Sequence, residues 1–164
     1  MIPKVTDIKG LKELDDFLKT LPEEMQRKML YSSLMTAAKP IMDQAKANVE
    51  REFGGSVHYT GTLAKGITRG RMKKTGLAAR VDVKLKRPKS TAKTRKGGVN
   101  KPHGDDPFYG RFLEFGTSKM NSKPWLRPAA MQKQAESSRK MRDALTKQVA
   151  KWCKANGVTY KPGS

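Results

Sequence analysis

Apolar residues recur at helical spacing through the first third of the chain. A short helix, which Thr6 or Asp7 can cap, is predicted by the apolar residues Ile8, Leu11, Leu14, Phe17, Leu18 and Leu21. Thr20 as a capping hydroxyl, Pro22 and two acids then mark the start of a second helix over residues 22–53. Pro40 lies inside it, so we expect either a kink near residues 36–40 or two shorter helices that meet there.

Further along the chain, the period of the apolar pattern changes. Residues 56–70 suit a loop with a short helical turn near 63–67, whereas apolar and polar residues alternate over 77–85. This alternation predicts a half-buried strand, antiparallel to a neighbour such as residues 66–74. A last helix is expected over 128–155. The predicted fold class is α+β, with long N-terminal helices, a small antiparallel sheet that carries an extended basic loop, and a C-terminal helix.

A segment rich in aromatic residues lies between the predicted sheet and the last helix. Its apolar residues, which must belong to a core or an interface, are Phe108, Tyr109, Phe112, Leu113 and Phe115. Their spacing favours a short helix, although the aromatic content would also suit a strand. Gly116 then permits a left-handed turn, which Thr117 and Ser118 can tie down.

The composition fits one domain over residues 1–164. Hydrophobic residues make up 36% and charged residues 30%, so part of the chain has no core to join. We expect a mobile basic arm at 86–106 and a flexible tail at 157–164. We also expect a soluble protein without membrane contact, because no run reaches the roughly 20 apolar residues of a membrane span. Cys153, the single cysteine, is expected to be a small buried residue.

The net charge of +20 is concentrated just before the aromatic segment. Residues 65–101 hold fourteen basic residues and one acid, Asp82, so this stretch contributes +13. We weigh three roles for the arm: nonspecific DNA contact, contact with an acidic neighbouring protein, or a solvated loop. The basic residues assigned to the first two roles are Lys84, Lys86, Arg87, Lys89, Lys93, Arg95, Lys96 and Lys101.

Few residues are candidates for catalysis. His58 and His103 have no partner at metal-ligand spacing, and the adjacent Asp105 and Asp106 tend to point apart in an extended chain. We therefore expect no enzymatic activity, no cofactor and no metal.

The run FYGRFLEFGTSKMNSKPWLRPAAM, residues 108–131, resembles the signature of the Hong Kong 97-type phage neck family. Upstream, Thr60-Gly61-Thr62-Leu63 followed by Ile67 is similar to a second, weaker signature of that family. The resemblance implies a virion protein that completes the tail end and joins it to the head connector within an oligomeric ring, with a hexamer favoured. It also implies neighbouring neck and tail-tube proteins as partners. The implied location is the head–tail junction, with the host cytoplasm during assembly.

Within this run, the residues assigned to the turn and to subunit contacts are Phe112, Glu114, Phe115, Gly116, Thr117, Trp125, Leu126, Arg127 and Pro128. We expect Glu114 either to pair with Arg127 or to cap a nearby backbone group. Packing within one subunit is favoured for Phe112, Leu113 and Phe115. Trp125 and Arg127 suit packing and subunit contact equally. The alternative function is a sequence-nonspecific DNA-binding or packaging accessory protein.

Overall fold

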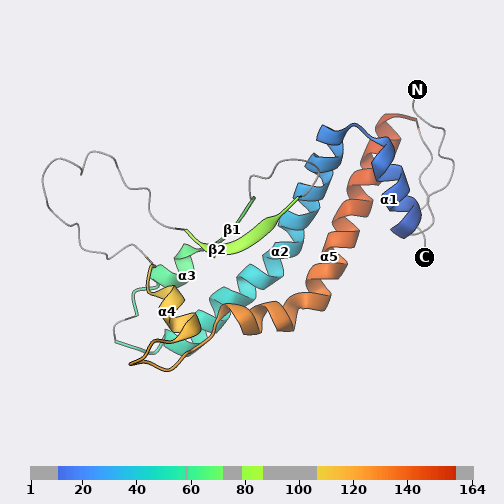
Figure 1. Ribbon diagram of the computed structural model, residues 1–164. Coiled ribbons are helices and arrows are strands. Elements are labelled where there is room, and N and C mark those ends of the chain that lie inside the picture. The colour runs from blue at the N-terminus through green and yellow to red at the C-terminus, as the bar shows by residue number, and fades with distance from the viewer. Residues whose placement is uncertain (1–10, 58, 72–78, 87–106, 158–164) are drawn as a thin grey trace, which may run out of the picture. The chain divides into compact units, whose positions relative to one another are not determined.

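The computed structural model describes residues 11–57, 59–71, 79–86 and 107–157 (Figure 1). Its elements, in chain order, are α1 (Leu11–Thr20), α2 (Glu23–Phe53), α3 (Thr62–Gly66), β1 (Ile67–Arg71), β2 (Val81–Leu85), α4 (Gly110–Phe115) and α5 (Leu126–Ala155). Helices predominate, and β1 and β2 form a two-stranded antiparallel sheet, which confirms the α+β class. In the part of the chain that the structure describes, no helix is long and apolar enough to cross a membrane.

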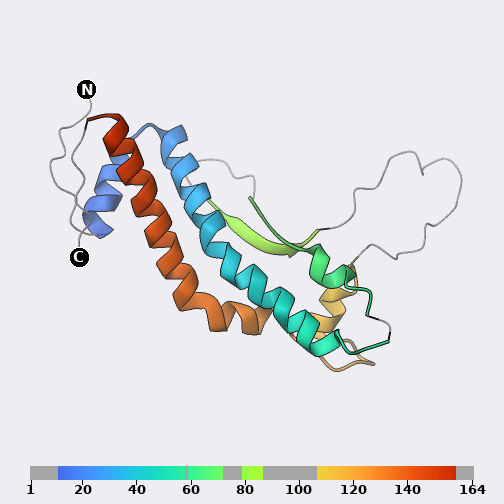
Figure 2. The ribbon, with the colours of Figure 1, turned by 180° about the vertical axis from the view of Figure 1, so that it is seen from behind.

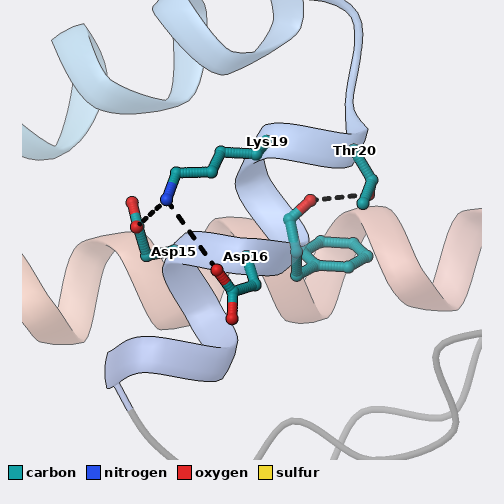
Figure 3. Close-up of polar contacts among 5 residues, drawn as sticks. Asp15, Asp16, Lys19 and Thr20 are labelled. Atoms are coloured by element: carbon teal, nitrogen blue, oxygen red, sulfur yellow. Dashed lines mark hydrogen bonds and ion pairs between the residues drawn. The ribbon is translucent and has the colours of Figure 1, made fainter.

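The helix α2 begins and continues largely as its sequence predicts. The carbonyl of Pro22 accepts the amides of Met25 and Gln26 at 2.9 and 3.0 Å, so the first helical hydrogen bonds start there. Thr20 does not act as the predicted cap of α2, because its hydroxyl donates to the carbonyl of Phe17 at 2.7 Å in α1 (Figure 3). Since α2 is continuous across Pro40, the alternative of two shorter helices is wrong, while the kink stays a prediction.

The remaining elements also follow the predictions, with shifted ends. β1 lies within the predicted range 66–74, and the aromatic segment forms the helix α4 rather than a strand. β2 begins at Val81, so Ala79 and Arg80, which the alternating pattern placed in the strand, lie before it. Residues 77–78 lie outside the described part. The helical turn near 63–67 is α3, and α5 starts two residues before the predicted position 128.

The chain divides into two compact units. Unit 1 comprises Met1–Lys39, Arg71–Asp82 and Ala135–Ser164, and unit 2 comprises Pro40–Gly70 and Val83–Gln134. The division within α2 falls next to Pro40, and the division within α5 falls between Gln134 and Ala135. Each unit has a hydrophobic core of its own, and the single domain over residues 1–164 stays a prediction.

The core of unit 1 is formed where α1 packs against α2 and α5 (Figure 1). Its buried residues are Phe17, Leu18, Leu21, Met29, Leu145, Val149 and Cys153. The rings of Phe17 and Trp152 meet edge to face, with centroids 5.5 Å apart, a favoured aromatic geometry. Ser137 of α5 donates its hydroxyl to the carbonyl of Ala37 in α2 at 2.8 Å, which ties these two helices together within the unit.

On the exposed side of α1, two acids share one lysine (Figure 3). Lys19 Nζ lies 2.6 Å from Asp15 Oδ2 and 3.8 Å from Asp16 Oδ1. The hydrogen bond from Lys19 to Asp15, followed by the attraction between their charges, raises the pKa of Lys19 above its usual value. All three side chains are about two-thirds exposed, so solvent screens this pair and it adds little to stability.

The core of unit 2 lies where α3, β1 and the start of α5 meet the second half of α2 (Figure 2). Its buried residues are Ala45, Val49, Leu63, Ala64, Ile67, Trp125 and Ala129. The amide of Lys86 donates to the carbonyl of Gly66 at 2.8 Å, which extends the pairing of the strands past their ends. Val83 and Leu85 of β2 pack on this core, so β2 contributes its apolar side to unit 2.

Candidate functional site

A buried polar contact of unit 2 joins α4 to the first turn of α5. The Glu114 carboxylate accepts the amides of Trp125 and Leu126 through Oε2, both at 2.8 Å, and the amide of Arg127 through Oε1 at 2.9 Å. These are amides that a helix start leaves without an intrahelical partner, and a negative charge is favoured at this end of the helix dipole. Of the two predicted roles for Glu114, the structure shows the backbone cap.

Trp125 is held in the core of unit 2 from several sides. Its side-chain nitrogen Nε1 donates to the carbonyl of Gly110 at 3.1 Å, and its backbone carbonyl accepts the Asn48 side-chain nitrogen Nδ2 at 3.0 Å. With its amide bound to Glu114, every hydrogen-bonding group of Trp125 has a partner. The residue is 3% exposed, so its ring packs within its own unit rather than lying open to a neighbouring subunit.

A glycine turn connects Glu114 to the segment that it caps. Gly116 has φ 76° and ψ 179°, a backbone conformation that residues other than glycine rarely adopt. The backbone groups of Thr117 and Met120 then bond to each other at 2.9 and 3.2 Å, and the amide of Lys123 returns to the carbonyl of Leu113 at 2.7 Å. The turn therefore brings residues 123–127 back beside α4, where Glu114 can reach their amides.

A second glycine allows α4 to approach the core closely. A Cβ at Gly110 would lie 2.5 Å from Leu85 Cδ1 and 2.6 Å from Leu63 Cδ1. The Gly110 carbonyl also accepts a hydrogen bond from the Trp125 side chain. A bulkier residue at position 110 would therefore disturb both this hydrogen bond and the packing against Leu85 and Leu63.

Beside this capped turn, unit 2 contains a groove of about 480 Å³. The apolar residues that line it are Leu85, Pro107, Phe108, Phe115, Trp125, Leu126 and Ala130, together with Gly110. Phe108 is 44% exposed and Phe115 is 70% exposed, so two aromatic rings face solvent at its edges. We name this feature the α4–α5 groove.

Positive charge predominates among the residues that line the α4–α5 groove. Lys84, Arg111 and Arg127 are exposed cations, and Glu114 is the one acid among the lining residues. Because both Glu114 oxygens accept backbone amides, its charge is turned toward the start of α5. Among the described residues, none of the three cations forms an ion pair, and Arg111 lies 5.9 Å from the centroid of the Phe112 ring.

The structure places the other predicted turn and contact residues as follows. Leu113 packs on the core of unit 2, as expected. Phe112 is 40% exposed and Phe115 is 70% exposed, which contradicts the favoured packing inside one subunit for these two rings. Leu126 is half-buried against the core of unit 2, and Arg127 is exposed. Thr117 forms the turn, as expected, and Pro128 lies in the first turn of α5.

The predicted basic arm falls mostly outside the described residues. Lys84 in β2 and Lys86 after it are exposed. Arg87, Lys89, Lys93, Arg95, Lys96 and Lys101 lie outside the described part, as do His58, His103, Asp105 and Asp106. In the part of the chain that the structure describes, no group of three or more histidine, cysteine, aspartate and glutamate side chains is placed to hold a metal ion.

Two buried titratable groups lie apart from the groove. Burial raises the pKa of the Cys153 thiol above its usual value, which fits the expected packing role of this residue in unit 1. Burial also raises the pKa of Tyr59 in unit 2, with smaller contributions from Glu50 and Tyr109. The Tyr59 hydroxyl has no hydrogen-bond partner among the described residues.

Sequence reasoning missed three contributors to this site. Asn48 lies within the predicted helix 22–53, three residues after Ala45 and so on the same helix face, where a polar side chain can form a buried hydrogen bond. The sequence gives no sign that Arg111 lines a groove, and it places Lys84 with the basic residues of the arm. The groove itself has no local signal, because its walls come from β2, α4 and α5.

Comparison with known proteins identifies the class of this chain. Residues 12–116, which are 105 of the 164 residues, match the HK97-gp10-like family model, described as "Bacteriophage HK97-gp10, putative tail-component". The match ends at Gly116, so residues 117–131, the larger part of the run over residues 108–131, lie beyond it, with Trp125 and Arg127 among them. Neither a curated protein nor a solved structure matches the chain. The chain belongs to the HK97-gp10-like family of bacteriophage proteins and is a structural component of the phage tail.

Proposed function

We propose that this tail component completes the tail end and joins it to the head connector as one subunit of a homo-oligomeric ring, with a hexamer favoured. It acts by binding neighbours at the head–tail junction and not by catalysis. Family membership supports a structural role in the virion.

The observation that carries the proposal is a set of large apolar side chains left exposed by the fold. The large hydrophobic residues of the described part that remain exposed are Val57, Phe108, Phe112, Phe115, Met120 and Met131. Five of these six lie in the run over residues 108–131. Apolar side chains that cluster at a surface mark contact sites, and aromatic residues and methionine are enriched in protein interfaces.

A ring also places requirements on charge and symmetry. A closed ring uses two different patches of each subunit, so an apolar patch on one subunit meets a different patch of the next. At +20, identical subunits repel one another, and acidic residues or partners must offset this charge at the contacts. We infer that the neighbouring neck proteins, rather than the ring alone, balance the charge.

The purified protein tests the ring directly. We expect native mass spectrometry and negative-stain electron microscopy to show a closed ring, and Phe112→Ser with Met120→Ser to reduce the protein to monomers. Val57→Ser is the matched control, because Val57 is 98% exposed and lies outside the run. A protein that stays monomeric at all concentrations, or that is unaffected by the double variant, contradicts a ring built through this run.

The second candidate function is sequence-nonspecific DNA binding during packaging. The observation that favours it is the composition of α5, where the acids are Glu136 and Asp143. The basic residues of α5 are Arg127, Lys133, Arg139, Lys140, Arg142, Lys147, Lys151 and Lys154. Binding to any duplex, lost between low and physiological salt and without a ring, would favour this function over the first.

A further inference from the structure

We propose that the α4–α5 groove binds an acidic segment of a neighbouring protein that presents an aromatic or branched aliphatic side chain next to carboxylates. This inference rests on the proposed function, since a joining subunit must bind a neighbour, and it assigns that contact to one place on unit 2.

The floor of the groove fits an apolar side chain. Leu85, Pro107 and Ala130 line it, and the rings of Phe108 and Phe115 stand at its edges. An aromatic or aliphatic anchor that fills such a recess is the usual centre of binding energy in a protein interface. Part of its wall is held in place by hydrogen bonds, because the Trp125 side chain donates to the Gly110 carbonyl and the Glu114 carboxylate accepts the Trp125 amide.

The rim of the groove fits carboxylates beside that anchor. Lys84, Arg111 and Arg127 come from β2, α4 and α5, so positive charge faces the groove from every element that lines it. None of the three is paired with a described acid, and the Glu114 charge is held by the amides of α5. Arginine can also bind a carboxylate through two parallel hydrogen bonds, which fixes the orientation of the bound segment.

Other occupants fit less well. A second copy of the chain would bring the same net charge of +20 to a groove whose rim is already positive. Residues 87–106 of the same chain are also a poor match, because they carry six basic residues against two acids. Duplex DNA would match the charge of the rim but would leave the apolar floor unused, because its phosphate backbone is what meets cations. An acidic, apolar protein segment satisfies both the floor and the rim.

The probe is a short fluorescein-labelled peptide of alternating Glu and Phe, measured by fluorescence anisotropy against the full-length protein. Control peptides replace Glu by Lys or Phe by Ser, and a labelled DNA duplex is measured in parallel. The protein variants are Lys84→Glu and Arg111→Glu. Lys119→Glu is the matched control, since Lys119 is exposed in the turn at 117–120 and does not line the groove.

We expect the Glu–Phe peptide to bind the unaltered protein and the Lys119→Glu variant alike. Lys84→Glu and Arg111→Glu should each weaken binding by about tenfold, and both control peptides should bind poorly. Thermal unfolding of each variant shows that it is folded, and the two groove variants lie on different elements, so one can fail without ending the test.

Three results would overturn the inference. The first is a Glu–Phe peptide that does not bind or binds all variants equally. The second is binding of the duplex, but not the peptide, that depends on Lys84 and Arg111. The third is loss of the ring, rather than of peptide binding, in the groove variants, which would make the groove a contact between copies. A failure of peptide binding with an intact ring leaves the proposed function standing, so the two can be told apart.

Discussion

At the scale of single residues, Glu114 connects the turn to the helix that follows it. Its carboxylate accepts hydrogen bonds from three backbone amides, and the residue is 8% exposed. The cap belongs to α5, yet its side chain comes from α4, so it couples the two elements. Glu114 is the one acid among the residues that line the α4–α5 groove, and among the described residues it forms no ion pair with the cations at the rim.

We predict that Glu114→Gln lowers the free energy of unfolding by about 2 kcal/mol. Glutamine keeps one acceptor oxygen but places an amide group where the second oxygen accepted hydrogen bonds, and it removes the charge. Urea unfolding, followed by circular dichroism, measures the difference.

The control for this change is Glu52→Gln. Glu52 pairs with Lys123 Nζ at 3.0 Å, but both side chains are about half exposed. The expected loss is therefore below about 0.5 kcal/mol. Equal losses in the two variants would show that Glu114 does not act as the cap of α5.

Single residues also show where sequence reasoning stops. The sequence indicated that Glu114 pairs or caps, but the choice depends on a turn that returns the chain to α4. Phe115 was expected in a subunit core because it is aromatic, yet 70% of it is exposed, because α4 turns Leu113 and Glu114 toward the core instead. Aromatic character predicts burial somewhere, and it does not distinguish the subunit core from an interface.

At the scale of elements, helices were predictable and their connections were not. The period of the apolar residues is a local property, so α2, α4 and α5 follow from the sequence with small errors at their ends. The Thr20 hydroxyl donates to the carbonyl of Phe17 in α1 and does not cap α2. A threonine hydroxyl can bond to backbone groups on either side of it in the chain, so the sequence alone does not decide between the two. β2 is shorter than the alternating pattern because the pattern shows which residues can pair and not which ones have a partner.

The turn after α4 gives the prediction at this scale. Gly116→Ala should lower the free energy of unfolding by about 2 kcal/mol, since φ 76° with ψ 179° is accessible almost only to glycine. An added Cβ would also lie 3.0 Å from the carbonyl oxygen of Met120 and the amide of Ser122. Thermal unfolding measures the effect.

Gly55→Ala serves as the comparison for Gly116→Ala. A Cβ at Gly55 meets no atom within 4 Å, so its substitution should change stability by less than about 0.5 kcal/mol. If Gly116→Ala proves as mild as this, the turn does not depend on the glycine conformation.

At the scale of the whole molecule, the net charge and the exposed apolar residues both support the proposal that this protein acts by binding neighbouring proteins. A chain of 164 residues with a net charge of +20 keeps Phe112, Phe115 and Met120 exposed in the described part. The sequence predicted the class of protein through the run at 108–131, and the family match over residues 12–116 confirms that class. It could not predict the two units or the α4–α5 groove, because these depend on contacts between residues far apart in the chain.

The central claim is that this tail component joins tails to heads, and electron microscopy of lysates tests it most directly. Cells infected with phage that lacks the protein should accumulate DNA-filled heads and separate tails, and plasmid-borne protein should restore tailed particles. Val57→Ser should restore them as well, whereas Phe112→Ser with Met120→Ser should not. A normal yield of tailed particles without the protein would contradict the account.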